Sequence, residues 1–250
     1  MANSPGFEKF KSELVKSADF ALTEYEDVAV RTAFAEKLGY KCHPVESSNH
    51  SASVYEGKDD IIVCFRGTND FKDVIIDASA FKVKRSIGRM HNGFVDSWET
   101  LKHDIYEILE KINPDKSRWI RVSGHSLGAA MATIASAYLH RKNYIIKRSF
   151  VFGSPNVGDK TWYEGFKARN IELLNIINSQ DIVTKVPWLF YKKVGEVDFF
   201  SPNPKKNSFL HKRPFTWNIF KRLWGGGKDH SMVGYAAKAK LLEEALIKKK

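Results

Sequence analysis

Residues 119–132 read WIRVSGHSLGAAMA and include the pentapeptide Gly124-His125-Ser126-Leu127-Gly128. The β-rich residues before the pentapeptide predict a strand, and the alanine-rich residues after it predict a helix. A G-x-S-x-G pentapeptide between a strand and a helix is typical of a sharp turn, which holds a serine hydroxyl above a sheet edge at a helix N-terminus. The pattern therefore predicts that Ser126 is a nucleophile.

A nucleophilic serine needs a base that accepts its proton. Among the histidines after Ser126, His140 falls about four turns along the predicted helix, roughly 20 Å away. His211 lies in a basic stretch without periodicity, whereas His230 follows three glycines and precedes the amphipathic run 232–247. We expect His230 to be the base, with His211 as the alternative.

The base in turn needs an acid that orients it. The candidates after Ser126 are Asp159, Asp181, Asp198 and Asp229. Asp181 directly follows a buried-looking strand at 172–177, and the carboxyl ends of parallel strands carry the sites of open α/β sheets. An N-cap of the following helix explains Asp159. We therefore expect Asp181 to be the acid.

Acyl transfer also requires an oxyanion hole, in which each donor contributes about 3 kcal/mol to the transition state. The backbone amide of Leu127, the residue after the nucleophile, supplies one donor. The apolar strand 61–65 leads through Arg66-Gly67 into Thr68. Thr68 offers both an amide and a hydroxyl, and we expect it to supply the second donor.

Six sequence blocks extend this pattern along the chain. In order they are Phe65-Arg66-Gly67-Thr68, His91-Asn92-Gly93-Phe94, Gly124-His125-Ser126-Leu127-Gly128-Ala129-Ala130, Phe152-Gly153-Ser154-Pro155-Asn156-Val157-Gly158, Asn178-Ser179-Gln180-Asp181-Ile182-Val183 and Asp229-His230. With these blocks the chain resembles the class 3 lipases, the family of the fungal triacylglycerol lipases. One departure is Asn156, where the family usually has arginine, and we expect this residue to be structural.

The resemblance implies an α/β-hydrolase fold, with a mostly parallel central sheet flanked by helices and a short helical lid. It also implies a triad of Ser126, Asp181 and His230, with Thr68 and Leu127 as the oxyanion hole. The expected activity is hydrolysis of carboxylic ester bonds in lipids, as in a triacylglycerol lipase, with no metal and no organic cofactor.

The sequence leaves two other functions open. Class 3 members also include phospholipases A1, so a phospholipase A1 that acts on anionic membranes is the alternative enzyme. A lipase-like membrane-binding protein without turnover is a further alternative. Such proteins usually lose a member of the triad, whereas every expected catalytic position here is occupied by a competent residue.

Residues 69–81, directly after the predicted oxyanion residue, have the pattern of a short amphipathic helix. Its apolar face holds, at helical spacing, Phe71, Val74 and Ile75. In class 3 lipases this segment is the lid that covers the serine, and we expect the same here. The alternative is a helix that stays packed on the sheet. The family counterpart of Asp77 hydrogen-bonds the oxyanion threonine, so we expect Asp77 to contact Thr68.

Basic residues concentrate at the end of the chain. Residues 185–250 hold fifteen Lys or Arg against five Asp or Glu, within a chain of net charge +11. Segment 188–228, between the expected acid and base, interleaves these cations with aromatic residues, a composition that suits an anionic bilayer surface. The membrane-surface candidates are Trp217, Phe220, Lys221, Arg222 and Trp224.

The same composition has two other interpretations. Aromatic residues between basic pairs also bind single-stranded nucleic acid, but no RNP, OB or zinc pattern accompanies them, so we do not expect nucleic acid as a partner. The aromatic residues could instead pack on the core beside a solvated face of lysines.

The length of 250 residues suits one α/β domain over 1–250. Residues 7–39 have helical periodicity and predict a cover for the sheet, while 45–53 and 61–65 resemble an antiparallel pair. The two cysteines, Cys42 and Cys64, have neither metal-site spacing nor a disulfide framework. The N-terminus lacks the apolar stretch of a signal peptide. We expect synthesis in the cytoplasm, with peripheral membrane attachment or release by another route.

Overall fold

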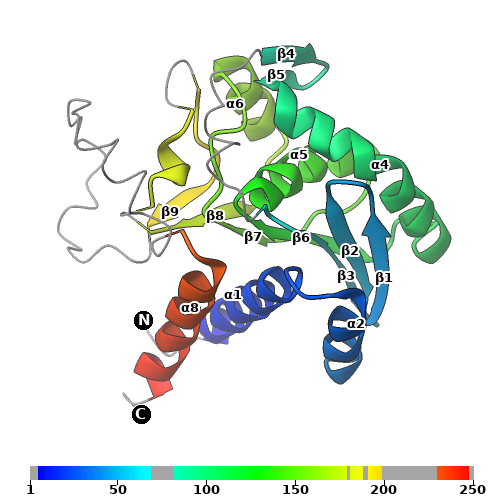
Figure 1. The fold of residues 1–250 in the computed structure, drawn as a ribbon, viewed down its shortest axis with the longest axis vertical. Helices are drawn as coiled ribbons and strands as arrows, with labels where there is room; N and C mark the ends of the chain where they lie inside the picture. Colours follow the sequence, from blue (N-terminus) through cyan, green and yellow to red (C-terminus); the bar gives the residue numbers. More distant parts are fainter. Residues whose placement is uncertain (1–4, 69–81, 179–180, 188–190, 199–229, 248–250) are drawn as a thin grey trace.

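Figure 1 shows the fold in a computed structural model, which describes residues 5–68, 82–178, 181–187, 191–198 and 230–247. The helices are α1 (Pro5–Thr23), α2 (Val28–Lys37), α4 (Asn92–Ile112), α5 (Leu127–Arg141), α6 (Lys160–Lys167), the 3-10 turn η2 (Val183–Lys185) and α8 (Met232–Ile247). The strands are β1 (Lys41–Glu46), β2 (Ser51–Glu56), β3 (Asp60–Phe65), β4 (Lys82–Arg85), β5 (Gly88–His91), β6 (Trp119–His125), β7 (Ser149–Phe152), β8 (Leu173–Ile177) and β9 (Glu196–Asp198).

The central sheet has the strand order β1-β2-β3-β6-β7-β8-β9. Strands β1, β2 and β3 pair antiparallel, and every pairing from β3 to β9 is parallel. Strands β4 and β5 form a separate hairpin. The predicted mostly parallel sheet flanked by helices is therefore confirmed.

Both faces of the sheet are covered by helices, as strand β3 illustrates. Ile61, Val63 and Phe65 belong to one buried apolar cluster, which also includes residues of α4, α5 and α6. The alternate residues Ile62 and Cys64 belong to a second cluster, with residues of α1 and α8. Figure 1 shows these two groups of helices on opposite sides of the sheet. Burial on both faces explains the nearly continuous apolar sequence of this strand.

The prediction of a single strand over residues 45–53 is wrong, because this segment contains the end of β1, a turn and the start of β2. In the turn, the Ser47 amide and hydroxyl donate to the His50 carbonyl over 2.8 and 2.9 Å. A serine side chain that satisfies local backbone groups competes with strand pairing. The sheet consequently gains one more antiparallel strand at its edge.

The predicted helical cover at 7–39 is confirmed as α1 and α2, which are separated by a turn at residues 24–26. The Asp27 side chain accepts a hydrogen bond from the Val30 amide over 2.9 Å and caps α2. Cys42 and Cys64 are free thiols, and burial raises the pKa of both. Among the helices described, none is both long and apolar enough to cross a membrane.

Candidate active site

Ser126 occupies the turn between β6 and α5, as the sequence predicts. Its backbone has φ 56° and ψ −122°, a conformation that a residue with a side chain rarely adopts. The serine is almost fully buried, and its amide donates a hydrogen bond to the Phe152 carbonyl over 3.0 Å. The turn thus fixes Ser126 between the N-terminus of α5 and the end of β7.

Two glycines allow this turn to pack tightly. A Cβ atom on Gly124 would lie 2.6 Å from the Gly128 carbonyl group, and one on Gly128 would lie 2.2 Å from the Phe65 carbonyl oxygen. Side chains at these positions would force the backbone apart, so the spacing of the pentapeptide follows from the close approach of α5 to β6 and β3.

Asp181 lies beyond the end of β8 and is fully buried. Its Oδ2 atom is 2.8 Å from Nδ1 of His230 and accepts a hydrogen bond from the Tyr235 hydroxyl over 2.7 Å. Its Oδ1 atom accepts from the Val183 amide over 2.9 Å. These partners offset the cost of burying a carboxylate charge. Because Nδ1 faces the carboxylate, the proton-accepting position of the imidazole is Nε2.

The end of β7 brings Ser126 and the Asp181–His230 pair together. Phe152 binds the amide of Ser126, and the next residue, Gly153, has φ +59°. A Cβ atom at Gly153 would lie 2.9 Å from Asp181 Oδ2 and 3.2 Å from His230 Cε1. The Ser126 turn and the Asp181–His230 pair therefore both adjoin the end of β7.

The two predicted oxyanion residues follow neighbouring strands. Phe65 of β3 pairs with Gly124 of β6 in parallel register, and Thr68 and Leu127 each come three residues later. Leu127 is the first residue of α5, where helical amides lack partners within the helix. Within the described part of the chain, the buried Thr68 hydroxyl oxygen has no hydrogen-bond partner. Both residues can therefore present donors at the same sheet edge.

Sequence reasoning missed two tyrosines at this site. The Tyr235 hydroxyl, on the first turn of α8, accepts from the Asn178 amide over 3.0 Å and donates to Asp181. The Tyr25 hydroxyl, just after α1, lies 2.7 Å from Nδ1 of His125. No local pattern marks either residue, because each contact joins segments that are far apart in the chain.

The alternative candidates occupy other places. Asp159 caps α6 and accepts from the Thr161 amide over 2.8 Å, which confirms the capping interpretation. His140 lies in the last turn of α5. The structural role expected for Asn156 is confirmed, because its buried side chain donates to the Pro187 carbonyl over 2.9 Å.

Several predicted residues lie outside the described part of the chain. They are the lid residues Phe71, Val74, Ile75 and Asp77, the membrane-surface candidates Trp217, Phe220, Lys221, Arg222 and Trp224, and the alternatives His211 and Asp229. The lid at 69–81 and most of segment 188–228 therefore stay predictions.

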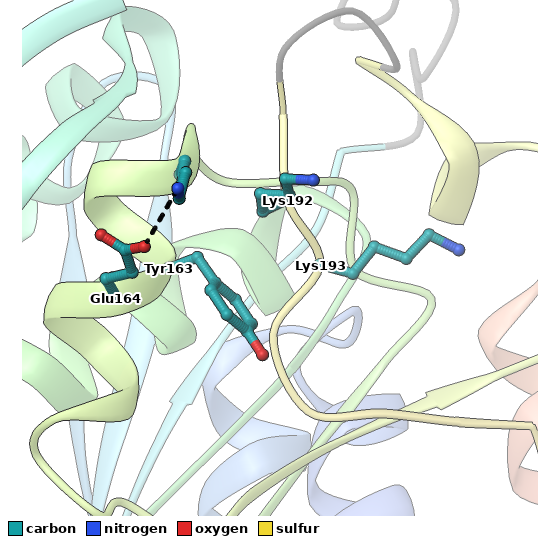
Figure 2. Close-up of a pocket in the computed structure, with 5 residues that line it drawn as sticks. Tyr163, Glu164, Lys192 and Lys193 are labelled. Carbon is teal, nitrogen blue, oxygen red and sulfur yellow. Dashed lines mark ion pairs between the residues drawn. The ribbon is translucent and has the colours of Figure 1, made fainter. Parts of the chain in front are cut away.

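A basic cavity lies beside α6. It has a volume of about 500 Å³ and is lined by Lys160, Tyr163, Glu164, Lys192 and Lys193. Figure 2 shows the Tyr163 and Glu164 side chains on α6, opposite the segment that carries Lys192 and Lys193. Lys160 pairs with Glu164 over 3.6 Å. The lining as a whole carries an excess of positive charge.

Known proteins resemble this chain in sequence. The family described as "Lipase (class 3)" matches residues 62–191, just over half of the chain. A lipase from Rhizopus niveus is 29% identical over 166 residues, covering 63% of this chain and 38% of the relative. Phospholipase A1-II 1 of Oryza sativa subsp. indica is 27% identical over 189 residues, covering 65% of this chain and 48% of the relative. The chain thus matches less than half the length of these curated relatives.

Solved structures share the fold. Lipase II from Rhizopus niveus superimposes with a TM-score of 0.67 at 23% identity, covering 76% of this chain and 80% of that one. The Rhizomucor miehei lipase propeptide complex gives a TM-score of 0.66 at 22% identity, covering 75% and 68%. The α/β-hydrolase fold is therefore confirmed. Taken with the family match over residues 62–191, these findings show that the chain belongs to the class 3 lipase family.

Proposed function

We propose that this chain hydrolyses carboxylic ester bonds of lipids by acyl transfer through Ser126. The observation that carries the proposal is the buried Asp181–His230 hydrogen bond of 2.8 Å, which the end of β7 holds next to the strained Ser126 turn. Membership of the class 3 lipase family supports the same chemistry.

The reaction has two steps. His230 Nε2 takes the proton from the Ser126 hydroxyl as the serine oxygen attacks the ester carbonyl, while Asp181 stabilises the imidazolium that forms. The Leu127 amide and the Thr68 donors stabilise the tetrahedral oxyanion. His230 then gives its proton to the departing alcohol. In the second step, water attacks the acyl-enzyme by the same route and releases the fatty acid.

The test is hydrolysis of p-nitrophenyl esters of graded chain length by the native protein and by Ser126→Ala. We expect a loss of at least about a thousandfold in the rate, because the nucleophile is removed. Ser123→Ala is the matched control, since Ser123 lies on β6, the strand that leads into Ser126, and its hydroxyl donates to the Ser17 carbonyl over 3.1 Å.

A fluorophosphonate supplies a readout that does not depend on turnover. We expect its covalent adduct on the peptide containing Ser126 in the native protein and in Ser123→Ala, but not in Ser126→Ala. Equal ester hydrolysis by the native protein and Ser126→Ala would contradict the proposal.

The main substrate we propose is a triacylglycerol at a lipid–water interface, with residues 69–81 as the lid. The relatives named as lipases support a lipid ester. Activity on a short soluble ester is then expected to rise above the micelle threshold of an added detergent. A flat response across that threshold would contradict a lid that opens at interfaces.

Phospholipid is a second candidate substrate, favoured by the basic cavity beside α6. Its three lysines against one glutamate give the lining a positive charge that suits a headgroup phosphate. Two relatives with similar coverage of this chain are named phospholipase A1.

The test compares the hydrolysis of phosphatidylglycerol vesicles with that of a triacylglycerol emulsion. We expect Lys192→Ala/Lys193→Ala to lower the ratio of the two rates by about tenfold, as the loss of two charge contacts at the surface would. The control is Lys37→Ala/Lys41→Ala, which removes the same charge from exposed positions near β1, at the other edge of the sheet. Equal ratios in both variants would exclude a phosphate-recognising role for the cavity.

A further inference from the structure

Tyr25 and His125 form a partly buried contact between the turn that follows α1 and the Ser126 turn. The Tyr25 hydroxyl lies 2.7 Å from His125 Nδ1, although the two residues are 100 positions apart in the chain. His125 is almost fully buried and directly precedes the proposed nucleophile. The contact thus reaches the site from an element to which the proposed reaction assigns no role.

Burial determines the protonation state of both groups. Burial raises the pKa of Tyr25 and lowers the pKa of His125 well below its usual range, so the phenol keeps its proton and the imidazole is neutral. A neutral imidazole has two tautomers, and the acceptor that the His230 backbone offers to His125 favours the one with the proton on Nε2, in which Nδ1 accepts from the Tyr25 O–H.

His125 in turn faces His230. Their rings lie 4.5 Å apart between centroids, inclined by 33°. Nε2 of His125 makes no hydrogen bond of standard geometry within the described residues. The backbone of His230 nevertheless opposes the fall in the His125 pKa, as an acceptor near the imidazole N–H does. In the Nε2–H tautomer, the N–H of His125 therefore faces the backbone of His230, the proposed base.

The same tyrosine reaches the proposed oxyanion loop. A Cβ atom on Gly67 would lie 2.2 Å from the Tyr25 hydroxyl oxygen and 2.6 Å from the His125 carbonyl oxygen. The Gly67 amide also lowers the Tyr25 pKa, as a hydrogen-bond donor to the phenol oxygen does. Only glycine permits this approach, and Gly67 directly precedes Thr68.

We propose that Tyr25 and His125 are positioning residues: the Tyr25 hydroxyl fixes the Nε2–H tautomer of His125 against the His230 backbone and holds the Gly67 backbone that leads to Thr68. The inference rests on the proposed ester hydrolysis. One hydroxyl would then set the position of both the base and the oxyanion donors. A neutral His125 also avoids a second positive charge beside the imidazolium that forms on His230.

The kinetic test uses Tyr25→Phe, with Tyr40→Phe as the matched control. Tyr40 is a largely buried tyrosine whose hydroxyl donates to Asp60 over 2.7 Å in another part of the molecule. For a short soluble ester, we expect Tyr25→Phe to lower kcat by about tenfold, the size of one lost hydrogen bond, with KM nearly unchanged. Rates are normalised to the fraction of protein that reacts with a fluorophosphonate.

His125 provides a second pair of variants. Glutamine retains an acceptor and a donor, whereas phenylalanine retains neither, so His125→Gln is expected to keep more kcat than His125→Phe. The double variant Tyr25→Phe/His125→Phe is expected to lose less than the product of the two single losses, because both changes break the same contact. If the loss of kcat in the double variant equals the product of the two single losses, the two residues do not act through one contact and the inference is overturned.

A readout independent of activity is the ¹⁵N NMR spectrum of the histidine side chains. The native protein is expected to show His125 protonated on Nε2 alone, and Tyr25→Phe to show a shift toward the Nδ1–H tautomer. If Tyr25→Phe leaves the His125 resonances unchanged and has the same kcat as Tyr40→Phe, the inference is overturned while the proposed ester hydrolysis stands. A native protein without Ser126-dependent hydrolysis would instead overturn the proposed function.

Discussion

At the scale of single residues, a comparison of Gly153 with Gly39 distinguishes two effects of a substitution, backbone strain and displacement of the Asp181 carboxylate. Both Gly153 and Gly39 have positive φ, +59° and +78°. A Cβ atom on Gly39 would meet nothing within 4 Å, whereas one on Gly153 would meet the Asp181 carboxylate at 2.9 Å. A side chain would therefore strain the backbone at both positions, and of the two only the one at Gly153 would also displace Asp181.

We expect Gly39→Ala to lower the free energy of unfolding by about 1 kcal/mol through strain alone, with kcat unchanged. Gly153→Ala is expected to lose more stability and to lower kcat for a short ester by about tenfold or more, because Asp181 and His230 must move. Denaturant unfolding and ester kinetics on both variants measure the two effects. Equal effects in the two variants would contradict the packing described for the end of β7.

At the scale of elements, a buried ion pair contacts strand β2. The pair consists of Glu24, between α1 and α2, and Arg31 on α2. Glu24 and Arg31 are both almost fully buried, and Arg31 Nη1 lies 3.3 Å from Glu24 Oε2. The Tyr55 hydroxyl of β2 donates a hydrogen bond to Glu24, and Arg31 also pairs with Glu46 of β1. Burial outweighs these partners and raises the pKa of Glu24 from 4.5 to about 7.

This raised pKa predicts the direction of a pH effect. Between pH 4.5 and about 7 the folded protein binds more protons at Glu24 than the unfolded chain does, so the free energy of unfolding falls as pH rises through this window. The loss is at most about 3 kcal/mol. Glu24→Gln is expected to remove that part of the fall, because the amide does not titrate, and Arg31 keeps its pair with Glu46.

The measurement is denaturant unfolding between pH 4.5 and 7.5, with Glu36→Gln, an exposed position on α2, as the control. The control is expected to follow the native protein. If the free energy of unfolding of Glu24→Gln also follows that of the native protein at every pH, Glu24 has the same pKa in the folded and unfolded states.

Elements specified by short-range sequence could be predicted, and contacts between distant elements could not. The strand, the turn and the helix around Ser126 follow from fewer than thirty consecutive residues, and the two glycines indicate the close packing of the turn. The prediction joins the end of β1 and the start of β2 into one strand, because only a few polar residues within 45–53 indicate the turn. Tyr235 reaches Asp181 across 54 positions of sequence, so its role depends on how α8 packs rather than on any local pattern.

At the scale of the whole molecule, charge is distributed very unevenly. The chain has a net charge of +11, and nearly all of it belongs to residues 185–250. Part of this charge lines the cavity beside α6, through Lys192 and Lys193. An excess of positive charge of this size predicts attraction to an anionic surface.

We therefore expect the protein to sediment with phosphatidylglycerol vesicles far more than with neutral phosphatidylcholine vesicles. The binding should weaken as salt rises, because the screening length shortens from about 10 Å at 0.1 M to about 3 Å at 1 M. Lys221→Glu/Arg222→Glu is expected to reduce binding more than Lys37→Glu/Lys41→Glu, which changes the net charge equally at exposed positions near β1. Equal reductions would show that net charge alone drives binding, and equally weak binding to both kinds of vesicle would exclude an anionic membrane as the partner of segment 188–228.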